Sequence, residues 1–592
     1  MGGVSTQMSY PVGSEVRDAI NYAWGQSQRN GAIAATCILV LGFPSIAIWK
    51  NYNVDPMSTG VGGDAFGLFY DAETGKVSGM NATGRSAAAL SIEWLRKHHP
   101  DHILSTMRLK KDSVYAVQVP GLVAGWCDAV ERWGSGKLTL AEILAPAIDL
   151  AENGFVISQV CADMWLEEES RLQKINKHDE NLRIFLPNDN FTAPRKGQLL
   201  TNKPFAATLR RIAQHGKRGF YEGPVAEAIV RELQSRDHVM TAADLAAHAT
   251  LFVDPICVPV LGHKIWEIPP NGSGIIALLA LGYISQLDQD GVINLRAMQH
   301  NSAEYLHVVI ECLKLAFRDS DEHVHDYEHY WRATGVDLAG QLKDLLHPSF
   351  FKQRIAHFSK DSVLDNRKIK HGVPDPAMRS DTVYFTVTDS DGNAFSFINS
   401  IYSHFGSAIV VPEHGFILQN RGDNFSLNPE SKNCLAGGKR TYHTIIPSMI
   451  TTPAGSREEL YASFGIMGGF NQPQAHVQVY LNMVLFGMDP QQALDAPRFC
   501  MTPHKYYKHT DLGLGANGPV CAQVTTVNIE EGVPEENISQ LRNLGHDIIV
   551  LRDRKRTLCG RGQVIRREQS AGKRVYAGGS DPRGDGASVA FF

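Results

Sequence analysis

Two hydroxyl residues, Thr382 and Ser400, stand at the open ends of a predicted β-hairpin. Residues 383–388 and 394–399 alternate apolar and other side chains, and Asp391-Gly392 between them is a strong turn signal. Residues equally distant from a hairpin turn lie opposite each other, so we expect Ser400 beside Thr382. A threonine with a second hydroxyl next to it can serve as a nucleophile that is oriented by a hydrogen bond.

The segment before the hairpin suggests how this threonine is activated. Residues 355–380 are charged, contain two prolines and show little periodicity, which is typical of an exposed loop. If the peptide bond between Asp381 and Thr382 is cut, the Thr382 hydroxyl becomes the nucleophile and its own freed α-amine becomes the general base. Taken alone, the hairpin favours a plainer interpretation, with Thr382 as a β-branched strand residue and Ser400 as a polar residue near it.

Size and composition limit the possible functions. The chain has 592 residues, of which 43% are hydrophobic and 20% charged, enough for two to four domains or one large sandwich. Its formal net charge is -5 and its sequence pI about 6.5, so no basic field is available to hold nucleic acid or an anionic membrane. We therefore expect a small-molecule substrate and no nucleic-acid partner.

Cysteine usage and the N-terminal segment indicate the compartment. Nine scattered cysteines without a CxxC pair argue against a disulfide framework or a zinc site. The first residues lack the pattern of a secretory signal. The apolar run 32–49 is broken at residues 42–45, which predicts a buried helix rather than a membrane anchor. A cytoplasmic protein is expected.

Periodicity predicts a mixture of helices and strands. No fixed-period repeat and no low-complexity linker occur, and the mixed elements with an antiparallel hairpin favour α+β layers over alternating βαβ units. Helical patterns cover residues 86–170, 203–248, 273–287, 473–486 and 534–544, and strand patterns cover 252–260, 264–268, 408–411 and 416–419.

Seven segments, in chain order, carry a resemblance to a known family. They are residues 58–77, 81–90, 119–134, 268–284, 381–426, 465–499 and 576–587. In this order they resemble the γ-glutamyltranspeptidase family. The resemblance implies a four-layer αββα sandwich of the N-terminal nucleophile hydrolase type, made as one zymogen that cleaves itself. Here the large subunit is expected to be 1–381 and the small subunit 382–592.

The resemblance also implies roles for individual residues. Thr382 matches the family nucleophile and Ser400 its supporting hydroxyl. Arg85 matches the arginine that binds a substrate carboxylate, a role suited to the bidentate guanidinium. Gly468 and Gly469 match the glycine pair whose backbone N–H groups face the developing oxyanion. The plainer alternatives are a salt-bridged surface arginine and a strand-to-helix turn.

Three features depart from the transpeptidase pattern. Asn424, with Arg421 nearby, stands where transpeptidases place an acidic residue for the substrate α-amine, and a neutral amide beside a cation holds a carboxylate better than an ammonium. His443-Thr444 replaces a tandem serine, and segment 425–440 is shorter than the one that carries a lid. These features are similar to cephalosporin-acylase-like members, although Asp423 remains a candidate for the amine.

Two other segments are less informative. Residues 43–52 look like an insertion that could disturb the core near residues 60–63. For the Gly-rich stretch 60–66 the resemblance implies a turn that lines the active site. His323, His325 and His329 could ligate a metal, but their spacing fits no standard signature, and a solvated, charged helix end is the better interpretation. No metal and no cofactor are predicted.

These inferences combine into a self-processing threonine amidohydrolase or acyltransferase with water or an amine as acceptor. The resemblance implies γ-glutamyl amides such as glutathione as substrates. One alternative is an acylase for dicarboxylic-acid monoamides that needs no α-amine. The other is an unprocessed, inactive relative with a binding role.

Overall fold

The computed structural model describes residues 57–177, 179–365, 382–503, 525–584 and 586–589. The predicted apolar helix at 32–49, the insertion at 43–52 and Asp381 lie outside the described residues. None of the helices within these ranges combines the length and apolar character needed to cross a bilayer.

The predicted hairpin is confirmed. Strands β8 (Val383–Thr388) and β9 (Ala394–Ser400) pair antiparallel with Val383 opposite Asn399. Asp389 closes the turn, because its Oδ1 accepts hydrogen bonds from the backbone N–H groups of Gly392 and Asn393, each at 2.8 Å. Gly392 has φ of 101°, a conformation that favours glycine. The register therefore continues to Thr382 opposite Ser400.

The hairpin belongs to a five-stranded sheet in the order β5-β2-β1-β9-β8. Strand β1 lies between β2 and β9, and its first residue, Asp64, pairs with Ser400. The start of β1, the end of β9 and the start of β8 thus meet at one edge of the sheet. The remaining bounds are β1 (Asp64–Asp71), β2 (Lys76–Ala82) and β5 (Leu251–Val253).

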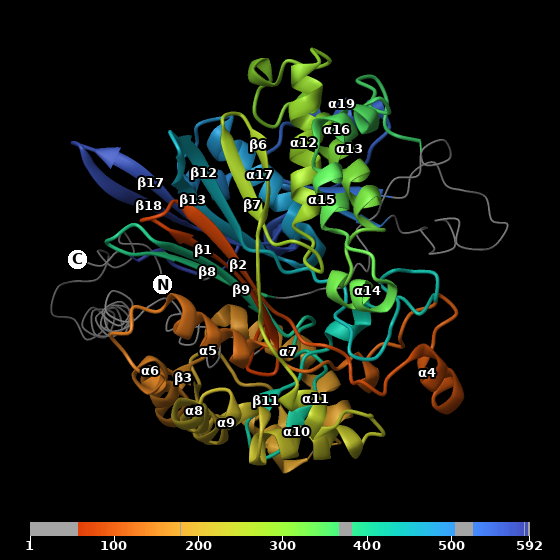
Figure 1. Cartoon of the computed structure of the whole chain (residues 1–592), viewed down its shortest axis with the longest axis vertical. Coiled ribbons are helices and arrows are strands. Elements are labelled where there is room, and N and C mark those ends of the chain that lie inside the picture. The colour runs from red at the N-terminus through yellow and green to blue at the C-terminus, as the bar shows by residue number, and fades with distance from the viewer. Residues whose placement is uncertain (1–56, 178, 366–381, 504–524, 585, 590–592) are drawn as a thin grey trace.

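A second, antiparallel sheet of six strands faces the first (Figure 1). Its strands, in the order β18-β17-β13-β12-β7-β6, are β6 (Ile256–Val260), β7 (His263–Glu267), β12 (Ser448–Ala454), β13 (Arg457–Met467), β17 (Arg561–Ser570) and β18 (Lys573–Ser580). A buried apolar cluster joins the two sheets, with Phe66 and Tyr384 from the first and Met449 from the second. Gly465 of β13 is needed here because a Cβ atom would lie 2.3 Å from the Tyr384 ring.

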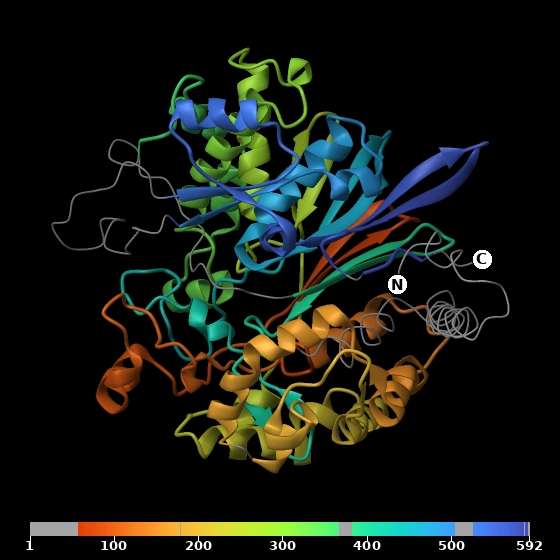
Figure 2. The ribbon, with the colours of Figure 1, turned by 180° about the vertical axis from the view of Figure 1, so that it is seen from behind.

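Helices pack against the outward faces of both sheets (Figures 1 and 2). Those associated with the first sheet are α4 (Ile92–His98), α5 (Leu122–Trp133), α6 (Leu140–Asn153), α7 (Gln159–Asn176), α8 (Lys203–His215), α9 (Arg218–Tyr221), α10 (Pro224–Gln234) and α11 (Ala242–Ala246). Those nearer the second are α12 (Ile275–Gln289), α13 (Ala303–Ser320), α15 (Ala339–Leu345), α16 (Pro348–Ile355), α17 (Gln472–Val484), α18 (Pro490–Asp495) and α19 (Glu535–Leu544). The predicted mixture of helix and sheet is confirmed.

Some predicted elements differ in extent. The run 252–260 is divided at Asp254-Pro255 into β5 and β6, which belong to different sheets, because proline removes a ladder donor where the chain crosses over. The strands predicted at 408–411 and 416–419 shrink to the two-residue β10 (Val410–Val411) and β11 (Phe416–Ile417). The other strands are β3 (Phe155–Val156), β4 (Leu199–Leu200), β14 (Phe499–Pro503), β15 (Thr525–Glu530) and β16 (Asp547–Leu551).

The interpretation of the segment that contains His323, His325 and His329 as a solvated helix end is wrong at its centre. Helix α13 ends at Ser320 and α14 (Tyr327–Thr334) begins after a turn in which His325 and Asp326 are buried. The Asp326 carboxylate accepts a hydrogen bond from the Arg440 backbone N–H at 2.8 Å, which explains its burial.

Candidate active site

Asp64 is the buried centre of the site. One carboxylate oxygen accepts hydrogen bonds from the backbone N–H groups of Gly84 at 2.9 Å and Gly121 at 3.2 Å. The other accepts from the Gln419 side-chain amide at 2.9 Å and lies 3.3 Å from Nε2 of His443. With four donors around it, the carboxylate has little capacity left for a further partner.

Burial controls the ionisation of this group and of two neighbours. Burial raises the pKa of Asp64 to about 6, although the Arg421 charge and the hydrogen bonds oppose the shift. Burial lowers the pKa of Arg421 to about 10, and Asp64 opposes that shift. The pKa of His443 lies well below its ordinary value because the ring is buried and Arg421 is near, so its imidazole is neutral and Nε2–H can donate to Asp64.

Thr382 and Ser400 are buried at the sheet edge next to Asp64. Thr382 is 2% exposed and Ser400 is fully buried. The Ser400 hydroxyl oxygen accepts a hydrogen bond from the Tyr402 backbone N–H at 2.8 Å, which fixes the orientation of the hydroxyl. The neighbouring Asn399 amide donates to the Thr59 hydroxyl at 2.8 Å and ties the Gly-rich turn before β1 to this edge.

Arg421 and Asn424 meet at the ring of Tyr402. The Arg421 guanidinium stacks 4.5 Å above this ring, and its Nη1 donates to the Thr444 hydroxyl at 2.9 Å. The Asn424 side chain accepts from the Tyr402 hydroxyl at 2.6 Å and donates to the Tyr442 carbonyl at 3.2 Å. Asp423, in contrast, is half-buried. The structure thus brings Arg421, Asn424 and Thr444 together.

Arg85 is engaged by an acidic side chain from a distant part of the sequence. Its Nη2 lies 2.6 Å from the Glu328 carboxylate of α14. The same carboxylate pairs with Arg440 at 2.9 Å and with Arg332. Partial burial raises the pKa of Glu328, but the arginines, Arg85 first, outweigh it and leave the carboxylate ionised. The salt-bridged alternative for Arg85 therefore describes its state in this structure.

The glycine pair forms a sharp turn between β13 and α17. Gly468 has φ of 137° and Gly469 has φ of 57°, conformations that side chains other than glycine adopt with strain. A Cβ atom at Gly468 would lie 3.0 Å from the Cα of Gly560. Gln472, the first residue of α17, accepts a hydrogen bond from the Ile446 backbone N–H at 3.0 Å. The turn is thus joined to the segment that carries His443 and Thr444.

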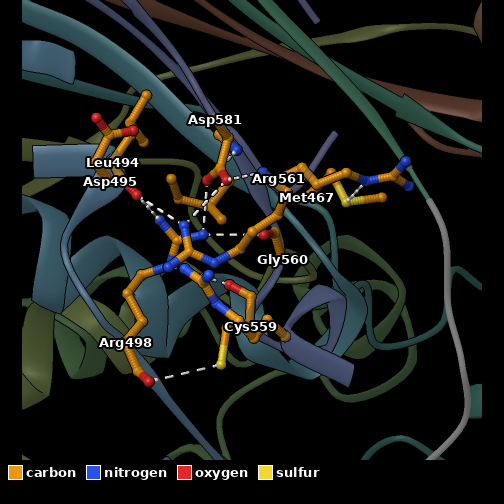
Figure 3. A network of polar contacts seen from close by, with 12 residues as sticks. Met467, Leu494, Asp495, Arg498, Cys559, Gly560, Arg561 and Asp581 are labelled. Carbon is orange, nitrogen blue, oxygen red and sulfur yellow. Dashed lines mark hydrogen bonds and ion pairs between the residues drawn. The ribbon is translucent and has the colours of Figure 1, made fainter. Parts of the chain in front are cut away.

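A buried polar network centred on Arg498 includes Gly560, the residue that Gly468 approaches, and Figure 3 shows Arg498 with its partners. Arg498 donates to the carbonyls of Gly560 at 2.9 Å, Cys559 at 3.2 Å and Leu494 at 3.1 Å. Its Nη2 also lies 2.6 Å from the Asp581 carboxylate, in the Gly-rich C-terminal run. The Arg498–Asp581 pair therefore holds Gly560 against Gly468.

Sequence reasoning missed several residues of this arrangement. Asp64 carried a signal, because it is an isolated acid between a Gly-rich turn and an apolar strand. Tyr402, Glu328 and Arg498 carried none, since their roles depend on partners far away along the chain.

The histidine and carboxylate atoms that lie close enough to share a metal ion are not those of His323, His325 and His329. Within the described ranges, the group close enough to hold a metal is His307, Glu311 and His546, all buried. The Lys314 ammonium donates to Glu311 at 2.8 Å, and His307 lies 2.8 Å from His546. The lysine thus already supplies a positive charge, and the group is explained as a buried polar network.

Comparison with known proteins establishes the family. The family profile described as Gamma-glutamyltranspeptidase matches residues 47–591. The chain belongs to the γ-glutamyltranspeptidase family. The resemblance expected from the seven segments is therefore confirmed.

Individual relatives of this family member differ in their named activities. The cephalosporin acylase from Bacillus halodurans superposes with a TM-score of 0.76 at 33% identity, covering 93% of this chain and 90% of that one. The glutathione hydrolase-like YwrD proenzyme of Bacillus subtilis strain 168 is 32% identical over 538 residues, 90% of this chain and 91% of the relative. The oxamate amidohydrolase proenzyme of Klebsiella pneumoniae is 29% identical over 544 residues, 91% of both chains.

The ionisation of Asp64 predicts a pH-dependent stability in this family member. Because the folded pKa is about 6 and the ordinary value is 3.8, the folded protein holds a proton that the unfolded chain has released between these values. Rising pH therefore weakens folding across this window, by about 3 kcal/mol at most. We expect the melting temperature of a Thr382→Ala protein that retains Asp64 to fall relative to that of the same protein with Asp64→Asn between pH 4 and pH 7.

Thermal melts at closely spaced pH values measure this difference. Both proteins carry Thr382→Ala, so that they share one covalent state, and other titrating groups cancel in the comparison. A difference in melting temperature that stays constant from pH 4 to pH 7 would contradict the assignment to Asp64.

Proposed function

We propose that the chain is a self-processing threonine amidohydrolase whose nucleophile is Thr382. The supporting observation is the convergence of Thr382, Ser400 and Asp64 at one sheet edge, set by the strand register. Relatives that cover about nine-tenths of the chain are named as proenzymes, which supports a precursor. We infer that cleavage before Thr382 divides the chain into a large subunit, 1–381, and a small subunit, 382–592, within a four-layer αββα sandwich.

The proposed reaction uses two groups of one residue. The Thr382 α-amine takes the hydroxyl proton while Oγ1 attacks the amide carbonyl carbon of the substrate. The C–N bond then breaks, and the leaving amine takes the proton as the acyl-enzyme ester forms. Water, or an amine acceptor, attacks this ester and restores the free hydroxyl. Ser400 orients the nucleophile through a hydrogen bond.

The glycine pair is proposed to stabilise the tetrahedral intermediate. Backbone N–H groups at Gly468 and Gly469 would face the oxyanion, and glycine lets the main chain approach closely. The support for this role is the positive φ of both residues and the close approach of Gly560, whose Cα would lie 3.0 Å from a Cβ atom added at Gly468.

The described site favours an acyl group without an α-amine. Asp64 is surrounded by four donors, and Asn424, which stands where transpeptidases place the amine-binding acid, is neutral and bonded at both ends of its amide. An ammonium would find no strong acceptor in these two groups. Monoamides of dicarboxylic acids are therefore the preferred substrates.

γ-Glutamyl amides such as glutathione are the second candidate. A glutathione hydrolase-like relative shares 32% identity with this chain, and Asp423 stands beside Asn424 on the same short helical turn, Arg421–Asn424. Rotation of Asp423 toward the substrate would supply an acid for the α-amine.

Maturation is the first test. Wild type is expected to give two polypeptides corresponding to 1–381 and 382–592 on a denaturing gel, the smaller one beginning with TVYFTV by N-terminal sequencing. Thr382→Ala should remain one chain and lose all turnover, because both the hydroxyl and the cleavage depend on Thr382. A smaller subunit with another first residue, in an active preparation, contradicts the proposal.

The support of the glycine turn gives a second test. A Cβ at Gly560 would lie 2.3 Å from the Met467 carbonyl oxygen, so Gly560→Ala must displace the turn at Gly468. We expect kcat to fall at least tenfold with KM within about threefold, because oxyanion donors act in the transition state. Gly572→Ala is the matched control, since Gly572 also has positive φ but meets no atom within 4 Å. Equal losses in both variants would exclude a specific effect on the turn.

A pair of anilides separates the two substrate classes. We expect kcat/KM for glutaryl p-nitroanilide to exceed that for γ-glutamyl p-nitroanilide, which differs by the α-amine. The reverse order would favour the glutathione-type activity. Adding an amino acid or dipeptide to the same assays measures how far an amine competes with water for the acyl-enzyme.

A further inference from the structure

Arg421 is a fully buried cation with unused donors. Its Nη1 donates to Thr444, but Nε and Nη2 are buried and have no hydrogen-bond partner within the described parts of the chain. Leaving a buried donor unpaired costs about 1–3 kcal/mol, and more for a charged group. Two adjacent N–H groups on one guanidinium edge match the two oxygens of a carboxylate.

Within the described ranges, other buried polar atoms without partners lie on His443, next to Thr444, and on two residues that are bonded to the segment 443–446. They are Nδ1 of His443, Oγ of Ser273 and Nε2 of Gln472, all buried. The Ser273 backbone N–H donates to the His443 carbonyl at 3.0 Å, and the Ile446 backbone N–H donates to the Gln472 side-chain oxygen at 3.0 Å. Buried polar atoms normally find partners, so their accumulation around 443–446 indicates a polar ligand at this place.

The site lies next to the proposed nucleophile. The Arg421 guanidinium stacks on Tyr402, and the Tyr402 backbone N–H bonds the Ser400 hydroxyl oxygen. Asp64, whose charge favours the ionised form of Arg421, is the register partner of Ser400. Two independent connections thus link Arg421 to the residue opposite Thr382.

Arg85 is less suited than Arg421 to bind the same ligand. Its guanidinium already contacts Glu328 at 2.6 Å, and that carboxylate is also held by Arg440 and Arg332. A substrate carboxylate beside Arg85 would have to displace or approach a like charge, which is unfavourable.

We propose that Arg421, rather than Arg85, holds the carboxylate of the acyl group, with Asp64 as the positioning residue that keeps this buried guanidinium charged and in place. The inference rests on the proposed amidohydrolase function and names the feature its substrates share, a carboxylate on the acyl side of the scissile amide. Arg85 and Glu328 then form a structural ion pair that closes α14 over the loop after β2.

Matched substitutions test the choice between the two arginines. The substrates are glutaryl p-nitroanilide and its terminal carboxamide analogue, which has the same length without the charge. Wild type should prefer the carboxylate in kcat/KM. Arg421→Gln should reduce this preference at least tenfold, mainly through KM of the charged substrate, whereas Arg85→Gln should change it less than threefold.

The opposite pattern overturns the inference. This result is a preference lost in Arg85→Gln and kept in Arg421→Gln, or no preference for the carboxylate in wild type. Failure of the proposed function looks different, because wild type would then remain one chain or Thr382→Ala would still turn over substrate.

A binding measurement covers the case in which Arg421→Gln does not mature. Glutarate should raise the melting temperature of mature wild type and of Arg85→Gln. Arg421→Lys keeps the charge but loses the two-pronged guanidinium edge, so the glutarate concentration needed for the same shift should rise at least threefold. Unchanged glutarate binding by Arg421→Lys, with loss in Arg85→Gln, also overturns the inference.

Discussion

The buried Asp64 carboxylate is the interaction on which the arrangement of the site depends. Its four donors come from four separate segments, at Gly84, Gly121, Gln419 and His443. A buried charge is tolerated only when it is well paired, so these segments are held at fixed positions around it. Gly84 directly precedes Arg85, and Gln419 lies two residues before Arg421. The Asp64 carboxylate therefore fixes the position of the chain next to both arginines.

The local parts of this arrangement could be predicted from the sequence. The hairpin of β8 and β9 has a strong turn signal and alternating strands, which fix its register and hence the pairing of Thr382 with Ser400. Helices α17 and α19 begin and end within about two residues of the expected positions because their apolar periodicity is clear. Such features depend on neighbours in sequence, which a single chain displays.

Long-range pairing could not be predicted in the same way. Glu328 and Arg85 are 243 residues apart, and nothing in the charged segment around Glu328 indicates which cation it meets. The same segment was interpreted as solvated, yet Asp326 is buried because the Arg440 backbone bonds it. Residues 252–260 likewise show one strand pattern in the sequence, whereas the chain changes sheets at Asp254-Pro255. Charged residues and prolines indicate that the chain does something unusual at these positions, but the sequence does not show which distant residues they contact.

Two of the fully buried arginines, Arg421 and Arg498, differ in how their charge is compensated. Arg498 has three carbonyls and the Asp581 carboxylate as acceptors, so its cost of burial is offset within the protein and it supports Gly560 rigidly. Arg421 has one hydroxyl acceptor and an aromatic face, and two of its donors have no partner within the described ranges. Unpaired buried donors destabilise a purely structural residue. In a binding site they favour the ligand, because a ligand carboxylate accepts the missing hydrogen bonds when it binds. The contrast between a satisfied and an unsatisfied buried cation therefore distinguishes Arg498, which supports the turn, from Arg421, which we propose binds the substrate carboxylate.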